Sequence, residues 1–366
     1  MSIAVSHHSL ANYPGLANDW QGLEARARND VFLSWAWMST WLQQYQPNAI
    51  VVKAERDGVV VGLGILVVYQ SKRRLGLLQS KQLHLHQTGV PAQDQIWIEY
   101  NDFLTSEPCQ AQMLAYLQQQ VEFDELVLGA IRDEDLERLN QQAQMPQHEL
   151  WTAPSFQVNL ANMPDYKACL SRNTRYQINR SAKRYEQAYG PLHIERPESL
   201  AQALQWFDDI GPLHLKRWGT GNAGSGYANP EFIGFHHRLI RQTWQVGLVD
   251  LVRVYAGEEL IATFYNLAYR GKVYFYLGGL AEPTDNQLKP GLLGHSLCIE
   301  NYRQRGYHTY DFMGGNERYK TQMAKKHCQL HKVALQQPHW GLALERLARL
   351  GKQQLGKQQA LRQGYD

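Results

Sequence analysis

The chain has 366 residues, of which 44% are hydrophobic and 19% are charged, and its formal net charge is +3. This composition excludes a disordered or fibrous chain, and the length allows two domains that each bury a sizeable core. The small net charge excludes an inference of nucleic-acid binding from composition alone, so any basic partner surface must be local.

The cysteines and the N-terminus indicate where the protein works. The four cysteines are far apart and lack the spacing of zinc ligands: Cys109, Cys169, Cys298 and Cys328. We therefore expect a reduced, cytoplasmic protein without a bound metal. The N-terminus lacks a basic segment followed by an apolar core of about 7 residues, and no apolar run reaches roughly 18 residues. We expect neither secretion nor a membrane span.

Helical and strand periods begin early in the chain. Residues 32–46 place Trp37, Trp41 and Tyr45 four positions apart, which predicts a helix that faces a core. Residues 49–70 read as two strands, because Asp57-Gly58 between them supplies the positive φ angles of a tight hairpin.

The rest of the first third completes an alternating α/β pattern. We expect strands at 94–100 and 125–131 and a helix at 108–121, so that a first domain ends near Leu150. Residues 145–164 contain three prolines and no helical period, and we place the domain boundary there.

A second α/β set follows a long polar helix at 165–190. Residues 248–280 read as three antiparallel strands joined by Gly-containing turns. The hairpin at 51–68 is weakly similar to the one at 251–268, with an apolar strand, a Gly-centred turn and a second apolar strand. This similarity predicts two copies of one domain, although any two hairpins share such features.

The loop after the strand at 272–280 is a candidate anion site. It closes in Pro290-Gly291 and leads into a helix at 292–306, whose first N–H groups and positive dipole end favour a pyrophosphate. Lys289 adds a positive charge. The alternative is that the loop only caps the helix.

A further strand at 307–313 leads into an unusual polar motif. In "YDFMGGNERYKTQMA", residues 310–324, an apolar run breaks into Gly-Gly and then offers Asn, Glu, Arg, Tyr and Lys within five residues. Packing of a core needs none of these polar groups, so the motif is a candidate for chemistry.

The order of strand, loop, helix, strand and polar motif resembles the GNAT acyltransferases. It more closely resembles the CelD/BioF-like group, which is related to the Fem peptidyltransferases. The likeness rests on "KPGLLGHSLCIENYRQRGYHTYDFMGGNERYK" and covers about 160–335, and "DVFLSWAWMSTWLQQY" extends it to the first domain. The chain departs from the family at Asn316, where Asp is frequent, and at Gly314, where a basic residue is common.

The resemblance implies an α/β (α+β) fold of tandem GNAT domains, each with a mixed, mainly antiparallel sheet flanked by helices. Residues 1–150 would be a degenerate N-terminal copy, 151–338 the catalytic copy that binds acyl-CoA, and 339–366 a basic helix or tail. Acetyl-CoA or another acyl-CoA would enter between the splayed strands at 274–280 and 307–313. The donor-binding residues implied are Leu277, Gly278, Lys289, Gly291, Leu292, Leu293 and Gly294.

An amine that attacks a thioester must lose a proton, which calls for a carboxylate near the splay. We favour Glu317 as acceptor binder or base, with Asp311 as the alternative. Lys320 would place a positive charge beside the tetrahedral oxyanion or an anionic acceptor. Tyr319 would orient Lys320 or protonate the leaving thiolate. The structural alternatives are a turn cap for Asp311, a core aromatic for Tyr319 and a surface charge for Lys320.

Other polar residues receive less specific interpretations. The acceptor side would hold Arg217, Trp218, Tyr276 and Asn316. His295 lies in the first turn of its helix, and we expect a structural or phosphate-side role for it. A basic stripe in the helix at 165–190 is either a solvated face or a contact for phosphate groups.

The predicted function is transfer of an acyl group, acetyl in the first instance, from CoA to an amino group. The acceptor would be a small molecule, a sugar, or an envelope or polysaccharide precursor. We expect direct attack, because no activated Cys or Ser is apparent. One alternative is a Fem-like peptidyltransferase that uses aminoacyl-tRNA, for which the helix at 165–190 looks too short. The other is a non-catalytic scaffold. The acceptor's identity, the oligomeric state and a peripheral membrane contact of the tail stay open.

Overall fold

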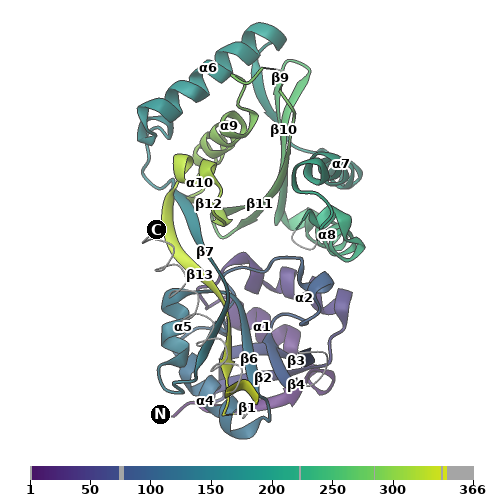
Figure 1. The fold of residues 1–366 in the computed structure, drawn as a ribbon, viewed down its shortest axis with the longest axis vertical. Coiled ribbons are helices and arrows are strands. Elements are labelled where there is room, and N and C mark those ends of the chain that lie inside the picture. The colour runs from purple at the N-terminus through teal and green to yellow at the C-terminus, as the bar shows by residue number, and fades with distance from the viewer. Residues whose placement is uncertain (1, 74–77, 222–223, 284, 339–340, 344–366) are drawn as a thin grey trace, which may run out of the picture.

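Residues 2–73, 78–221, 224–283, 285–338 and 341–343 are described in a computed structural model of the chain (Figure 1). In this part of the chain, thirteen strands form one continuous, mainly antiparallel sheet with helices on both faces. The fold is therefore mixed α/β, as predicted. The expected tail at 339–366 lies, apart from residues 341–343, outside the described residues. Among the described helices, none is both long enough and apolar enough to cross a membrane.

The elements fall into two halves of the chain. The first half holds strands β1 (Ala4–Ser9), β2 (Ala49–Arg56), β3 (Val59–Arg73), β4 (Leu78–Leu85), β5 (Leu104–Thr105) and β6 (Glu125–Arg132). Its helices are α1 (Leu16–Glu24), α2 (Trp35–Tyr45), α3 (Pro91–Asp94), α4 (Gln110–Gln120) and α5 (Asp133–Asn140).

The second half holds strands β7 (Gln147–Asn159), β8 (Leu192–Glu195), β9 (Val249–Ala256), β10 (Glu259–Tyr269), β11 (Lys272–Leu280), β12 (Thr309–Gly314) and β13 (Lys325–Gln336). Its helices are α6 (Arg172–Tyr189), α7 (Leu200–Trp218), α8 (Pro230–Thr243), α9 (Pro290–Gln304) and α10 (Arg318–Met323).

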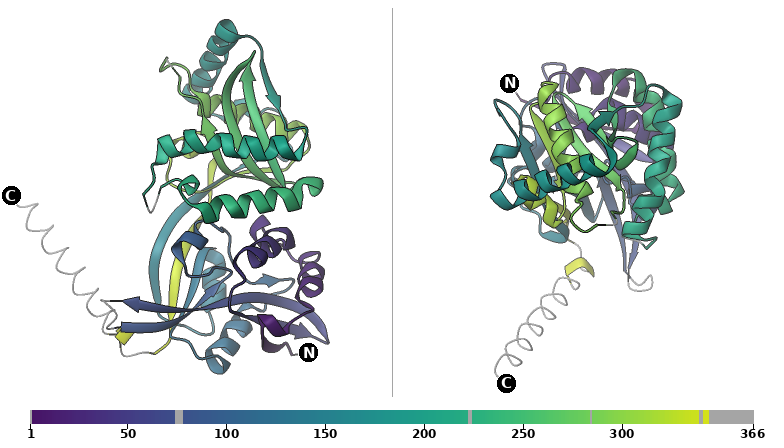
Figure 2. Two further views of the ribbon diagram at one scale, coloured as in Figure 1. Left: turned by 90° about the vertical axis from the view of Figure 1, so that its right-hand side faces the viewer. Right: turned by 90° about the horizontal axis from the view of Figure 1, so that it is seen from above.

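The two halves have the same strand order, and the last strand of the second half completes the first half. The order across the sheet is β1-β2-β3-β4-β6-β13-β7-β12-β11-β10-β9-β8, so β13 completes the first half and β7 completes the second. In each half one neighbouring pair is parallel, β4 with β6 and β11 with β12. Helices cover both faces of each half, and Figure 2 shows α7 and α8 side by side over one face of the second.

The hairpins whose sequences are weakly similar also share their irregularities. Asp57 and Gly58 have φ of 52° and 77°, the positive values that the hairpin reading requires. The pairing of β2 with β3 shifts register between Ala54 and Glu55, and that of β9 with β10 shifts between Leu260 and Ala262. A bulge at the same place in both hairpins supports the interpretation of two related copies.

A shared aromatic core joins the halves. Helix α2 begins at the N-cap Ser34, whose hydroxyl accepts a hydrogen bond from the Trp37 N–H at 3.3 Å. The Trp37 ring packs edge-on against Phe235 of α8, with ring centroids 4.8 Å apart. Because α2 and α8 pack together, one buried cluster extends across both halves.

Two local predictions are wrong. The strand expected at 94–100 is absent: α3 ends at Asp94, and Trp97 and Tyr100 have φ of 43° and 52°, which a strand does not allow. Its alternating pattern arises because an irregular segment crosses a core and buries every second side chain. The supposed linker at 145–164 contains β7, which pairs with β12 and β13 at the centre of the sheet. The division of the chain near residue 150 stays a prediction.

Candidate active site

The parallel strands β11 and β12 separate after a short paired stretch. They pair at Lys272 with Thr309, Val273 with Tyr310, and Tyr274 with Asp311. β11 then continues to Leu280 and β12 to Gly314 without further pairing to each other. The splay that the sequence predicted is present.

Two adjoining cavities occupy this splay. The central cavity has a volume of about 480 Å³ and is lined by residues 275–278 of β11 and 312–315 at the end of β12. The side cavity, of about 250 Å³, lies at the start of α9. The two share Arg217, Phe275, Gly278 and Tyr319, so a ligand in one can reach the other.

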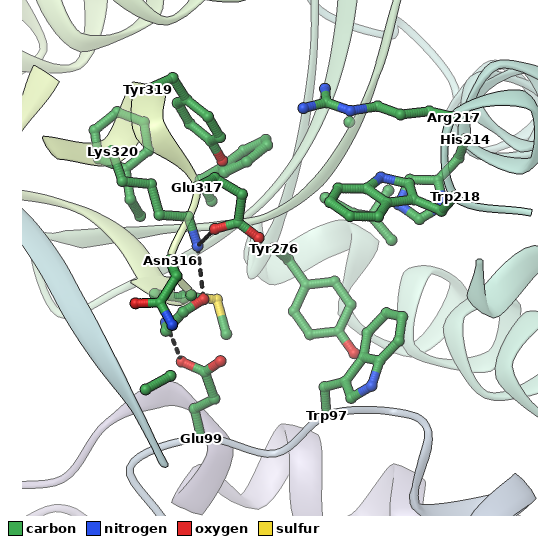
Figure 3. A pocket seen from close by; sticks show the side chains of 18 of the residues that line it. Trp97, Glu99, His214, Arg217, Trp218, Tyr276, Asn316, Glu317, Tyr319 and Lys320 are labelled. Carbon is green, nitrogen blue, oxygen red and sulfur yellow. Dashed lines mark hydrogen bonds and ion pairs between the residues drawn. The ribbon is translucent and has the colours of Figure 1, made fainter. Parts of the chain in front are cut away.

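The walls of the central cavity differ in character (Figure 3). One wall carries polar groups: Glu99, Asn316, Glu317, Tyr319 and Lys320. The opposite wall carries aromatic and basic groups: Trp97, His214, Arg217, Trp218 and Tyr276. A ligand between them would meet charge on one side and aromatic rings on the other.

Lys320 and Glu317 form the charged pair of the polar wall. The Lys320 Nζ lies 3.1 Å from Glu317 Oε2 and donates to the Gly314 carbonyl oxygen at 2.6 Å. Lys320 is only 5% exposed, so it is not the surface charge of the alternative reading. Gly315 has a φ of 142°, and a Cβ there would overlap Glu317 Oε2 and lie 2.7 Å from Lys320 Nζ. The positive φ favours glycine here, and a Cβ would also displace the ends of the two charged side chains.

Asp311 is turned away from the central cavity. Its carboxylate is fully buried and pairs with Lys272 at 2.9 Å. It also accepts hydrogen bonds from the Tyr100 hydroxyl at 3.0 Å, the Gln157 amide at 2.9 Å and the Met313 N–H at 2.7 Å. The structure therefore uses Asp311 to hold β12 and does not bring it together with Glu317, Lys320 and Tyr319.

Glu99 is a carboxylate that sequence reasoning missed. It lies in the segment after α3, and its Oε2 accepts a hydrogen bond from the Gly314 N–H at 2.8 Å. Loss of hydration raises the pKa of Glu99 to about 7, although that hydrogen bond and the Lys320 charge oppose the rise. The sequence did contain a signal for Glu99, because it is an acidic residue on the less buried side of the alternating run 94–100.

The tryptophans at the mouth of the cavity were only partly foreseen. Trp218 was predicted, whereas Trp97 and Trp151 were not, and the three are 44%, 38% and 43% exposed. The Arg217 guanidinium lies 5.1 Å from the centre of the Trp218 ring. Large aromatic side chains left this exposed around one cavity indicate a binding surface.

The predicted donor residues divide between the cavities and the core. Gly278, Lys289, Gly291 and Leu292 line the side cavity, and Leu277 lines the central one. Leu293 is fully buried, and a Cβ on Gly294 would come within 3.0 Å of the Phe264 ring. The last two residues therefore pack α9 against the sheet rather than face a ligand.

His295 is a neutral, buried ring. It stacks on Phe264 and on Tyr319, with ring centroids 4.5 Å and 5.4 Å apart, and its Nδ1 shares a hydrogen bond with the Tyr310 hydroxyl at 3.1 Å. Burial lowers the pKa of His295 to about 3. His295 also lines the side cavity, so this placement fits either of the expected roles, structural or phosphate-side. Burial also raises the pKa of Tyr319, so its hydroxyl keeps its proton and can donate.

Helix α6 supports the start of α9. The Ser181 hydroxyl of α6 accepts a hydrogen bond from the Lys289 N–H at 3.0 Å, and Arg184 pairs with Asp285 at 2.6 Å. The first N–H groups of α9 have no partner within the helix and border the side cavity. These groups, with Lys289, can bind an anion there.

The comparisons with known proteins agree with this geometry. Residues 172–321 match the family model of the acetyltransferase (GNAT) domain, so the second half contains a GNAT-type domain. A search of curated proteins finds no match.

Solved structures are similar in fold at low sequence identity. FemX has a TM-score of 0.57 at 11% identity, with 90% of this chain and 97% of FemX covered. The C-terminal domain of a putative lysylphosphatidylglycerol synthetase from Agrobacterium fabrum has a TM-score of 0.53 at 10% identity, covering 91% and 95% of the two chains. L-PGS from Bacillus licheniformis has a TM-score of 0.51 at 11% identity, covering 93% and 96%. These likenesses establish the fold alone.

Proposed function

We propose that the protein transfers an acyl group from acyl-CoA to an amino group. The observation that carries the proposal is the junction of the two cavities in the splay between β11 and β12. The side cavity offers the N-terminus of α9 to a pyrophosphate, and the central cavity offers a lysine and carboxylates to an amine. A thioester that passes through the splay would meet the amine at Gly278, which both cavities share.

The side chains at the junction have roles that follow from their chemistry. Lys320 is held by Glu317 and would stabilise negative charge that develops on the thioester oxygen. The Tyr319 hydroxyl lines both cavities and would donate its proton to the leaving sulfur. Arg217, which also lines both, would bind an anionic part of either substrate.

We propose an amino sugar as the class of acceptor. A sugar ring presents a flat face of C–H groups and an edge of hydroxyl groups, which matches an aromatic wall facing a polar one. Trp97 and Trp218 would pack on the ring face, while the amine would point to Glu99, Glu317 and Lys320. Purely aliphatic amines would leave the polar wall without partners.

The narrower proposals rest on fewer observations. The CelD/BioF-like grouping and a role in envelope polysaccharide synthesis rest on the motif at 310–324. A cytoplasmic location rests on the free thiols of all four cysteines. The aminoacyl-tRNA alternative receives less support, because the segment expected to contact tRNA is the single helix α6 followed by β8.

The proposal is tested by following the release of free CoA thiol from acetyl-CoA with a panel of amines. We expect turnover with D-glucosamine or a glucosamine oligosaccharide and little with n-hexylamine. Turnover restricted to n-hexylamine would refute the acceptor class, and no turnover with any amine would favour the tRNA-dependent or scaffold reading.

A further inference from the structure

We propose that Glu99, a residue of the first half, is the general base for the reaction in the second half. This inference rests on the proposed function and assigns its proton acceptor to a different carboxylate from Glu317.

The first half places Glu99 firmly in the cavity of the second. Glu99 Oε2 accepts the Gly314 N–H at 2.8 Å, at the end of β12. The next residue, Tyr100, donates to Asp311 at 3.0 Å, and the Tyr276 hydroxyl of β11 donates to the Ile96 carbonyl. Both splayed strands therefore hold the segment that carries Glu99.

Of the carboxylates that line the central cavity in the described part of the chain, Glu99 is the one without an ion pair. The other is Glu317, which pairs with Lys320 at 3.1 Å. Asp311 has four partners and does not line the cavity. The described hydrogen bond of the Glu99 carboxylate uses Oε2 and leaves Oε1 for a ligand. Figure 3 shows the carboxylate pointing into the cavity.

The groups around Glu99 suit a proton acceptor at neutral pH. Lys320 stabilises its negative charge, whereas Asp311 and Glu317 oppose it. Tyr100 and Tyr276 also face it, and their raised pKa values keep both hydroxyls neutral. The raised pKa of Glu99, about 7, lies near neutral pH, where a general base acts most efficiently.

In the first half, the parallel strands β4 and β6 also separate after a short paired stretch. The segment that carries Glu99 fills the space between them. β4 and β6 pair only at Gln82 with Glu125, Leu83 with Leu126, and His84 with Val127, much as β11 and β12 do. Beyond these pairs, Asn101 Nδ2 donates to the Leu85 carbonyl at 2.8 Å, and Asn101 Oδ1 lies 2.8 Å from His86 Nδ1.

Side chains occupy the space beyond the paired stretch of β4 and β6. A Cβ on Gly129 of β6 would overlap the Gln87 amide. The segment that fills this space also presents Trp97 and Glu99 to the second half.

The proton balance of the proposed step is simple. The Glu99 carboxylate takes one proton from the acceptor ammonium and later releases it to water. The freed amine forms a C–N bond to the thioester carbonyl carbon, and the C–S bond breaks. The second proton leaves the nitrogen for the thiolate through the Tyr319 hydroxyl. The products are an amide, free CoA thiol and one released proton.

The test compares Glu99→Gln and Glu99→Asp with the control Glu122→Gln, a first-half glutamate whose side chain is 95% exposed. Glutamine keeps an oxygen for the Gly314 N–H, so the fold should persist. We expect unchanged acetyl-CoA affinity by calorimetry and a kcat about 10²- to 10⁴-fold lower for Glu99→Gln, with partial recovery in Glu99→Asp. In the wild type, kcat should rise through pH 7 as the Glu99 carboxyl loses its proton. This rise should disappear in Glu99→Gln and persist in Glu122→Gln.

Two measurements separate this role from a structural one. Hydroxylamine, an acceptor that is mostly unprotonated at pH 7, should show a much smaller defect in Glu99→Gln than glucosamine does, because it needs no initial deprotonation. Carboxyl ¹³C NMR should detect one glutamate that titrates near pH 7 in the wild type and is missing in Glu99→Gln.

The proposal is overturned if Glu99→Gln retains wild-type kcat and pH dependence, or if Glu317→Gln alone abolishes the rise through pH 7. If the wild type binds no acyl-CoA, the proposed function fails instead, and the NMR titration still reports whether the Glu99 carboxyl titrates near neutrality.

Discussion

Lys272 of β11 and Asp311 of β12 form a buried ion pair, with 2.9 Å between Nζ and Oδ2, across the short stretch in which the two strands pair. Lys272 also contacts Asp30 of the first half at 3.0 Å. Burial alone would lower the pKa of Lys272, but the two carboxylates raise it. The pair thus ties both halves together where the splay begins.

Asp311→Asn should destabilise the protein rather than act on catalysis directly. It leaves the buried Lys272 ammonium with one carboxylate fewer, which should lower the free energy of unfolding by about 3 to 5 kcal/mol. Urea denaturation measures this, with Glu282→Gln as the exposed control, expected to change stability by less than about 0.5 kcal/mol. If Asp311→Asn has normal stability but no activity, the result would instead support the catalytic role that the sequence suggested for Asp311.

Gly315→Ala should impair the site through the Lys320–Glu317 pair. The added Cβ overlaps the Glu317 carboxylate and takes up a φ of 142°, so we expect kcat/KM to fall by roughly 10-fold or more. Gly221→Ala is the matched control, because its Cβ would meet nothing within 4 Å. Equal activity of the two variants would show that the spacing of the pair is unimportant.

Trp97→Ala and Trp218→Ala should weaken binding of the acceptor. Loss of one stacking surface should raise KM for glucosamine by roughly 3- to 10-fold and leave acetyl-CoA affinity unchanged. Val246→Ala, an exposed apolar residue that does not line the cavity, is the control. If the tryptophan variants reduce acetyl-CoA affinity instead, the aromatic wall belongs to the donor site.

His295 should make the fold sensitive to acid. Its pKa is about 3 when folded and about 6.5 when unfolded, so between these values the unfolded chain binds more protons. The free energy of unfolding should therefore fall as the pH drops below about 6.5. For this residue the slope approaches about 1.4 kcal/mol per pH unit.

The His295→Phe variant isolates that contribution. A phenyl ring suits the aromatic surroundings but cannot bind a proton, so the loss of stability between pH 6.5 and 4 should be shallower than in the wild type. Denaturation series at several pH values measure the slope. An identical slope in both proteins would show that His295 does not titrate on unfolding.

Local chemistry explains what could be predicted from the sequence. The hairpin at Asp57-Gly58 follows from its turn residues, whereas the splay of β11 from β12 was implied by the resemblance to the GNAT acyltransferases; both are present. On this side of the candidate site, Lys289 was named from the loop before α9, and Gly278 and Lys320 were named from the family resemblance. Their roles in binding and catalysis stay predictions.

Long-range pairing explains what was missed. The pairing of β7 with β13 joins strands whose first residues, Gln147 and Lys325, are 178 positions apart in the chain. No local sequence pattern encodes this pairing. Glu99 was hidden because an irregular segment over a core imitates the alternation of a strand. Asp311 looked catalytic by type, because its partners Lys272 and Tyr100 become visible only in three dimensions.

The most direct test of the account is calorimetric titration of acetyl-CoA and longer acyl-CoAs into the wild type, Gly291→Glu and Gly291→Gln. Gly291 lies in the first turn of α9 and borders the side cavity, and the closest atom to a new Cβ is the flexible Leu280 Cδ1 at 3.2 Å. A carboxylate there would repel the pyrophosphate, while the neutral glutamine controls for size. The account predicts micromolar binding to the wild type, retained in large part by Gly291→Gln and lost in Gly291→Glu. Absence of binding to the wild type, or equal binding by all three proteins, would contradict it.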